Sequence, residues 1–189
     1  AVARKYLSYF QGRLPAGEAG DQRVLRNIVP ENRLRSYEIR DVIEGFTDTS
    51  SFLELRRHFG LGMVTGLARV DGRAIGVLAN NPKHLGGAID SDGADKAARF
   101  MQLLAAFDIP LVVPHANRVF LAGANLTIPT FMVVVRKAIG LGAMAMGGGS
   151  LKAPMFTVGW PTSEIAGMGL EGQVRLGYRI ELAAIADPA

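Results

Sequence analysis

The stretch Met63–Asn80, MVTGLARVDGRAIGVLAN, indicates the fold more directly than any other part of the sequence. Two runs of apolar and β-branched residues flank the pair Asp71-Gly72. Asp-Gly is typical of tight hairpin turns, because glycine adopts positive φ angles without steric cost. The stretch therefore predicts two antiparallel strands, Met63–Val70 and Ala74–Asn80, joined by a short turn.

Downstream of this hairpin, the pattern predicts an alternation of helices and strands. After Asp90 the apolar residues recur at the spacing of one helix face, at Ala97, Phe100, Met101, Leu104 and Phe107. Asp92 is expected to cap this helix, and Asp95 to lie in its first turn. Two unbroken apolar runs, Ile109–Val113 and Phe131–Val135, predict strands buried on both faces of a sheet.

The remaining elements complete an α/β pattern. Pro110 is expected at the very start of its strand, where a missing N–H is tolerated. Helices are predicted at Ala116–Leu126, between the two apolar strands, and within Glu171–Ile185. Upstream, residues 1–10 and Ile39–Gly45 have helical patterns, and the Gly- and Pro-containing stretch 11–22 reads as a linker.

Composition excludes several classes of protein. The 189 residues carry a formal net charge of +4 and no cysteine, which excludes disulfides and thiolate ligands and fits a reducing, cytoplasmic setting. Basic residues form no stripe interleaved with aromatics, so a nucleic-acid partner is not predicted. No apolar run approaches the ~20 residues of a membrane helix, so we predict no membrane partner either.

The sequence contains no recognisable side-chain motif for a metal site, a nucleophile or a nucleotide. The three histidines, His58, His84 and His115, have no metal-ligand spacing. The acidic residues after Ile89 resemble part of a calcium loop, but Ala94 occupies the third ligand position and no glutamate falls at the twelfth. Motifs for a serine nucleophile, a P-loop or a dinucleotide are absent from the sequence. We predict no metal site.

The segment Arg136–Met146, RKAIGLGAMAM, followed by Gly147–Gly149, is the strongest candidate for a site. It comes directly after a predicted buried strand and is expected to open a short helix. Backbone amides at a helix N-terminus offer hydrogen bonds and a partial positive charge to an anion, and small residues let a substrate reach the backbone. Close packing of a strand against a helix, which merely requires glycine, is the alternative interpretation.

Several motifs together resemble one family. In chain order they are Ile28–Pro30, Tyr37–Ile43, Val64–Asn80, Lys96–Phe100 (KAARF), Arg136–Met146 and Trp160–Gly169 (WPTSEIAGMG). This series is similar to the carboxyltransferase (β) subunits of biotin-dependent acyl-CoA carboxylases, such as propionyl-CoA and methylcrotonyl-CoA carboxylases. The resemblance implies a crotonase (ClpP/crotonase)-like fold of repeated ββα units. It also implies that residues 28–189 are the C-terminal carboxyltransferase domain, and residues 1–27 a connecting helix and linker from an N-terminal domain outside this sequence.

The resemblance also implies a reaction and its site. The family moves a carboxyl group from N1′ of carboxybiotin to the α-carbon of an acyl-CoA, while two backbone amides hold the ureido oxygen of biotin. Aligned without gaps, these amides fall at Leu141 and Gly142, which we take as the catalytic positions. Gly140, Ala143 and Met144 are the implied substrate-binding residues, and Met144 falls where the family shapes acyl-group choice. Leu141 replaces a family glycine, so its amide can serve only if its φ is negative.

The implied partners and the alternatives follow from the same family. Biotin is carried on a partner, a biotin carboxylase or biotin carboxyl carrier subunit. Acyl-CoA binds through the N-terminal domain, and the subunits form dimer-based homo-oligomers, including hexamers. A biotin-dependent acyl-CoA decarboxylase subunit is the first alternative, and a non-catalytic crotonase-fold assembly module is the second. The junction Pro114-His115 motivates the second, because family members carry an additional stretch there, including a Pro-Gly loop beside the biotin site.

Overall fold

A twisted six-stranded sheet forms the centre of the molecule. The computed structural model describes residues 1–32, 34–114, 126–140 and 153–185. Within these ranges the strand order is β1-β2-β3-β4-β5-β7, with antiparallel pairing from β1 to β3 and parallel pairing from β3 to β7. The bounds are β1 Leu53–Leu55, β2 Met63–Val70, β3 Arg73–Asn80, β4 Leu111–Pro114, β5 Thr130–Val134 and β7 Phe156–Gly159.

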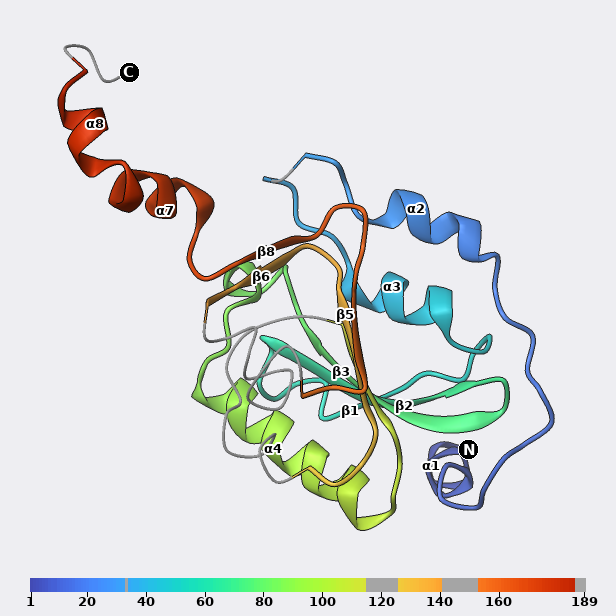
Figure 1. Ribbon diagram of the computed structural model, residues 1–189. Helices are drawn as coiled ribbons and strands as arrows, with labels where there is room; N and C mark the ends of the chain where they lie inside the picture. Colours follow the sequence, from blue (N-terminus) through green and yellow to red (C-terminus); the bar gives the residue numbers. More distant parts are fainter. Residues whose placement is uncertain (33, 115–125, 141–152, 186–189) are drawn as a thin grey trace.

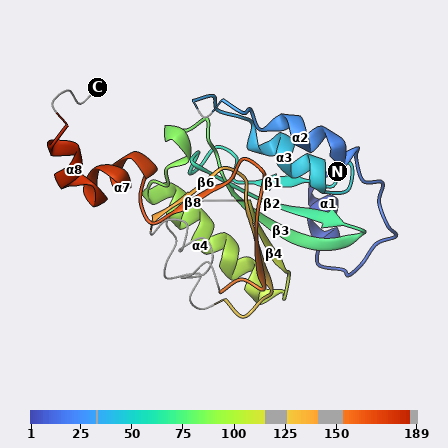
Figure 2. The same cartoon turned by 45° about the horizontal axis from the view of Figure 1, so that its top comes forward.

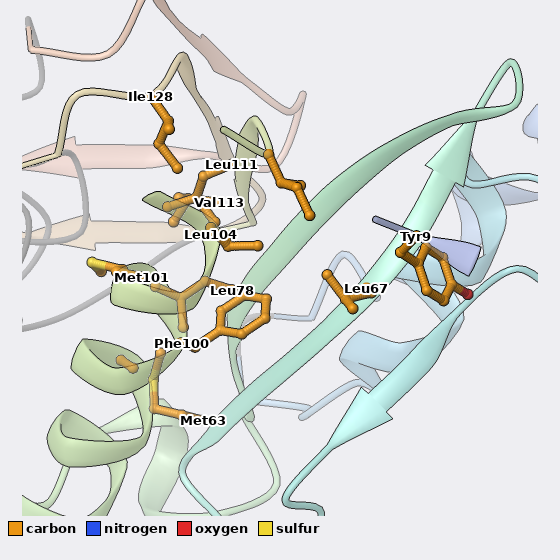
Figure 3. Close-up of a cluster of buried hydrophobic side chains, with 12 residues drawn as sticks. Tyr9, Met63, Leu67, Leu78, Phe100, Met101, Leu104, Leu111, Val113 and Ile128 are labelled. Carbon is orange, nitrogen blue, oxygen red and sulfur yellow. The ribbon is translucent and has the colours of Figure 1, made fainter. Parts of the chain in front are cut away.

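Helices cover the two faces of this sheet. The long helix α4 (Ser91–Ala106) lies on one face and α3 (Ile39–Phe46) on the other (Figure 1). Alternate residues of β2 enter different cores, because successive strand side chains point to opposite faces. Leu67 and Leu104 belong to the core on the α4 side, and Val64 and Ile43 to the core on the α3 side. Figure 3 shows the α4-side core, which runs from Ile128 at one end to Tyr9 at the other.

A second, two-stranded sheet lies beside the end of β5. Its strands, β6 (Lys137–Ile139) and β8 (Glu164–Ala166), pair in parallel. After β8, the helices α7 (Leu170–Gly177) and α8 (Arg179–Ala183) extend away from the rest of the molecule (Figure 2). No side chain described in α8 is buried.

The N-terminal segment packs against the β2–β3 hairpin. Helix α1 (Val2–Ser8) is followed by Tyr9, which is buried in the α4-side core. The backbone N–H of Leu14 donates to the carbonyl oxygen of Gly72 at 3.0 Å. The short helices η1 (Gln22–Val24) and α2 (Leu25–Ile28) lead on toward α3, and η2 (Leu85–Gly87) precedes α4. The division at residues 27 and 28 stays a prediction.

The structure confirms the main elements predicted from the sequence. The hairpin pairs in the expected register, with Val70 opposite Arg73, and both apolar runs form parallel strands. Pro110 lies immediately before β4, and its carbonyl oxygen accepts the N–H of Gly76 at 2.8 Å. The predicted helix Ala116–Leu126 falls almost entirely outside the described residues.

Both predictions for the start of α4 were wrong, because Asp92 is not its cap and Asp95 lies beyond its first turn. The cap of α4 is Asp90, whose side chain accepts the N–H of Gly93 at 2.8 Å; Asp92 already lies in the first turn. A capping residue needs extended backbone, and Asp90 has it, with φ −84° and ψ 179°. Strand β6 lies between Val135 and the predicted short helix, and the residues of that helix beyond Gly140 lie outside the described residues. β6 forms through pairing with β8, a long-range contact that local periodicity does not reveal.

Candidate functional site

The described approach to the glycine-rich turn is a close crossing of two chain segments. β5 leads through Val135 and Arg136 into β6, which ends next to Gly140. Gly140 has φ +67°, a left-handed conformation that favours glycine. A Cβ atom at this position would lie 3.3 Å from the carbonyl oxygen of Gly167. Main chain, with no intervening side chain, therefore meets main chain at the entrance to the turn.

Hydrogen bonds align these two segments along their length. The N–H of Trp160 donates to the carbonyl oxygen of Val134 at 2.8 Å, and the Thr162 hydroxyl donates to that of Val135 at 2.9 Å. The N–H of Glu164 then donates to the carbonyl oxygen of Arg136 at 2.5 Å. The structure thus brings together two of the motifs recognised in the sequence, the one that begins at Arg136 and the one that begins at Trp160.

A third motif reaches the same place through the side chain of Arg136. This side chain is buried, and its guanidinium donates to the carbonyl oxygens of Arg35, at 2.5 Å, and of Pro30. The guanidinium carbon also lies 5.2 Å from the centre of the Tyr37 ring. Burial raises the pKa of Tyr37 to about 12, although the nearby Arg136 charge opposes the increase. The segment before α3 is therefore anchored to the β5–β6 junction.

Of the five predicted site residues, only Gly140 is described. Leu141, Gly142, Ala143 and Met144 lie outside the described residues, so their assigned roles stay predictions. The role of Gly140 also stays a prediction, since the crowding of a methyl group there by Gly167 fits close main-chain packing as well as a ligand site. Main-chain groups dominate the described part of the crossing, and oriented main-chain donors can stabilise developing negative charge.

Sequence reasoning assigned no role to Lys96, which is almost completely buried. Its ammonium group donates to the carbonyl oxygen of Met63 at 2.7 Å and so ties α4 to the start of β2. Burial lowers the pKa of Lys96 to about 8, and the negative charge of Glu54 partly opposes this change. The signal was present in the sequence, because Lys96 lies four residues before Phe100 on the apolar face of the helix.

Other site types find little support in the described parts of the chain. No group of three or more His, Asp or Glu side chains is placed there to hold a metal ion. Helices long and apolar enough to cross a lipid bilayer are likewise absent from residues 1–32, 34–114, 126–140 and 153–185.

Comparison with known proteins gives one consistent result. The family model described as the carboxyl transferase domain matches residues 2–125 and 115–187. The biotin-dependent acetyl-/propionyl-coenzyme A carboxylase beta6 subunit of Mycobacterium bovis is 37% identical over 187 residues, which cover 88% of this chain and 39% of the relative.

Solved structures agree. A single-chain, multi-domain long-chain acyl-CoA carboxylase superimposes over the whole chain with a TM-score of 0.88 and 48% identity, covering 20% of that protein. The transcarboxylase 12S hexamer, with methylmalonyl-CoA and methylmalonic acid bound, matches 99% of the chain at a TM-score of 0.84 and 32% identity. These likenesses confirm the predicted crotonase-type α/β fold. The chain spans 41% of the matched 12S chain.

Proposed function

Because the chain belongs to the carboxyl transferase family, we propose that it is the biotin-binding half of an acyl-CoA carboxyltransferase. One observation carries this proposal. The chain enters the glycine-rich turn at Gly140, in a left-handed conformation, and an added Cβ atom there would lie 3.3 Å from the carbonyl oxygen of Gly167. Main chain without side chains at the entrance to the turn is compatible with a site built from main-chain donors.

In this proposal the reaction depends on main-chain electrostatics. Carboxybiotin, carried by a partner, would supply the carboxyl group: its N1′–carboxyl bond breaks, and a bond forms to the acyl-CoA α-carbon. The α-proton passes to the biotin nitrogen. The N–H groups of Leu141 and Gly142 would stabilise the negative charge that develops on the ureido oxygen, and Met144 would line the acyl pocket.

The proposed assembly follows the relatives. The M. bovis relative is named biotin-dependent, and the 12S protein is described as a hexamer with methylmalonyl-CoA bound. We infer a biotin carboxylase or biotin carboxyl carrier as partner, acyl-CoA held through an N-terminal domain, and a dimer-based homo-oligomer. The reaction would take place in the cytoplasm, in keeping with a sequence free of cysteine.

The junction at Pro114-His115 is the main departure from the family. The family model matches in two segments that meet and overlap at residues 115–125, where the sequence analysis expects an additional stretch in relatives. This break supports the rival proposal of a non-catalytic assembly module. The motifs on both sides of the break still converge at Arg136 and Gly140, which favours the enzyme.

The test is carboxyl transfer by the full-length protein with its biotinylated partner. Acetyl-, propionyl-, butyryl- and methylcrotonyl-CoA are offered as acceptors, and the corresponding carboxylated thioesters as donors, so that the direction of transfer is measured too. Gly142→Pro removes one proposed amide donor and is expected to lower transfer by about 100-fold or more while assembly is retained. Wild-type activity in this variant would refute the site, and no transfer by the wild-type protein would favour the non-catalytic module.

A further inference from the structure

We propose that Arg136 is a positioning residue that fixes the path of the chain into the glycine-rich turn. Three segments meet at this one residue. Its guanidinium holds the segment before α3 through Pro30 and Arg35, and its own carbonyl oxygen accepts the N–H of Glu164 at 2.5 Å. Figure 1 shows the chain leading into α3 passing beside the end of β5. The inference deepens the proposed function and rests on it.

The short strand between Arg136 and Gly140 makes this anchor necessary. β6 is three residues long and pairs only with β8 in the described sheets, and β8 has the same length. A pair this short has little stability of its own. Its position is therefore set at its two ends, by Arg136 at the start and by the crossing of Gly140 with Gly167 at the finish.

The contacts of the guanidinium suit arginine and no other side chain. Its two terminal nitrogens donate to two carbonyl oxygens, while its planar face lies near the ring of Tyr37. A lysine ammonium keeps the charge but cannot present the same fixed fork. A methionine keeps an unbranched apolar stem and loses the charge and the donors. Each substitution therefore removes a defined part of the anchor.

Arg69 provides a matched control on the far side of the sheet from β6. It is also buried, donates to the carbonyl oxygens of Ser8 and Gly72 at 2.6 and 2.7 Å, and lies 5.0 Å from the centre of the Tyr9 ring. Its contacts join α1 to the hairpin and none reaches β6 or Gly140. A substitution at Arg69 therefore measures the effect of losing a buried arginine without any effect on the position of β6.

The experiment compares Arg136→Met, Arg136→Lys and Arg69→Met in the full-length protein with its partner. We expect Arg136→Met to lower kcat/KM for free biotin as carboxyl acceptor by about tenfold or more, because small misplacements of a site are costly in rate. The KM for the carboxylated acyl-CoA that donates the carboxyl group should stay within about twofold, and Arg136→Lys should recover part of the loss. Arg69→Met should lower the melting temperature and leave both kinetic constants within about twofold.

Hydrogen exchange tests positioning without relying on activity. Amides of residues 137–139 and 164–166 are expected to exchange faster in Arg136→Met, and at the wild-type rate in Arg69→Met. If Arg136→Met folds but shows neither effect, or if Arg69→Met produces both, the proposal fails. Where Arg136→Met does not fold, Tyr37→Leu, which removes only the ring, takes its place with the same expectations. If the wild-type protein transfers no carboxyl group, the proposed function fails, and the exchange result still decides the role of Arg136.

Discussion

Two buried arginines solve the same physical problem in two regions of the molecule. Arg69 lies under the β2–β3 hairpin beside Tyr9, and Arg136 lies at the β5–β6 junction beside Tyr37. Each charge is compensated by backbone carbonyl oxygens and an aromatic face, in the contacts described for both residues. Burial of a charge is costly unless hydrogen bonds replace the lost water, so both sites depend on those carbonyl groups.

The two anchors differ in what they hold. Arg69 attaches a helix that precedes the hairpin, and its three carbonyl partners, Ser8, Gly12 and Gly72, surround the end of α1. Arg136 attaches a loop to the chain that enters the candidate site. The same interaction therefore stabilises the fold in one region and places the site in the other. The N-terminal segment, predicted as part of a connection between domains, contributes Tyr9 to the α4-side core of this domain.

The largest expected effect is on stability. Arg69→Met leaves three carbonyl oxygens without this donor and should lower the free energy of unfolding by about 2–4 kcal/mol, whereas Arg136→Met leaves two and should cost about 1–3 kcal/mol. Urea unfolding measures both. Double-mutant cycles with Tyr9→Leu and Tyr37→Leu are expected to give coupling energies of about 0.5–2 kcal/mol in each region. A larger loss at Arg136 than at Arg69 would reverse the comparison.

Much of the fold was predictable because it depends on local pattern. The Asp71-Gly72 turn and the apolar spacing of α4 each follow from chemistry within a few residues, and the structure confirms both except at Phe107, which lies beyond the end of α4 and is exposed. β1 and β6 were missed, since each is three residues long and forms only through its partner strand. The sequence places both Asp90 and Asp92 just before the apolar pattern of α4, and only the backbone conformation identifies Asp90 as the cap.

The location of the candidate site in the chain was predictable from the sequence, but its backbone conformation and contacts were not. Composition and resemblance indicated the turn after Arg136, and the structure supplies the left-handed Gly140 and its crossing with Gly167. Arg136 itself was recognised only as part of a motif. Its partners lie 101 and 106 residues away in the chain, and no sequence spacing links positions so far apart. The buried state of Lys96 was visible in the helical pattern and was overlooked.

Glycine substitutions sharpen the comparison at the backbone level. A Cβ atom at Gly72, where φ is +71°, would overlap the carbonyl oxygen of Leu14 and lie 2.8 Å from that of Pro15. Gly72→Ala should therefore cost about 1–3 kcal/mol from strain and overlap together. At Gly140 the carbonyl oxygen of Gly167 is the nearest atom among the described residues, 3.3 Å from an added Cβ, so Gly140→Ala should cost only about 1 kcal/mol, mainly from its positive φ. Urea unfolding of both variants measures the two losses of stability. Equal losses would mean that Leu14 and Pro15 move away from the new methyl group at residue 72 with little cost.

The smallest effect is a dependence on alkaline pH that both regions should share. Burial raises the pKa of Tyr9 and of Tyr37 from 10.0 to about 12. Between these values the unfolded chain releases each phenolic proton before the folded chain does, so the stability of the wild-type protein falls as the pH rises. At pH 11 this loss amounts to about 1 kcal/mol for each tyrosine.

Phenylalanine has no proton to lose, so Tyr9→Phe and Tyr37→Phe should each gain stability relative to wild type between pH 9 and pH 11. Tyr9→Phe starts lower at pH 9, because the Tyr9 hydroxyl donates to the carbonyl oxygen of Ser51 and that bond is worth about 1 kcal/mol. Urea unfolding at the two pH values measures the change, with the exposed Tyr178→Phe as the control. A pH response at only one of the two tyrosines would show that the two phenol groups are not equally buried. The likeness of the two regions would then be limited to the contacts of Arg69 and Arg136.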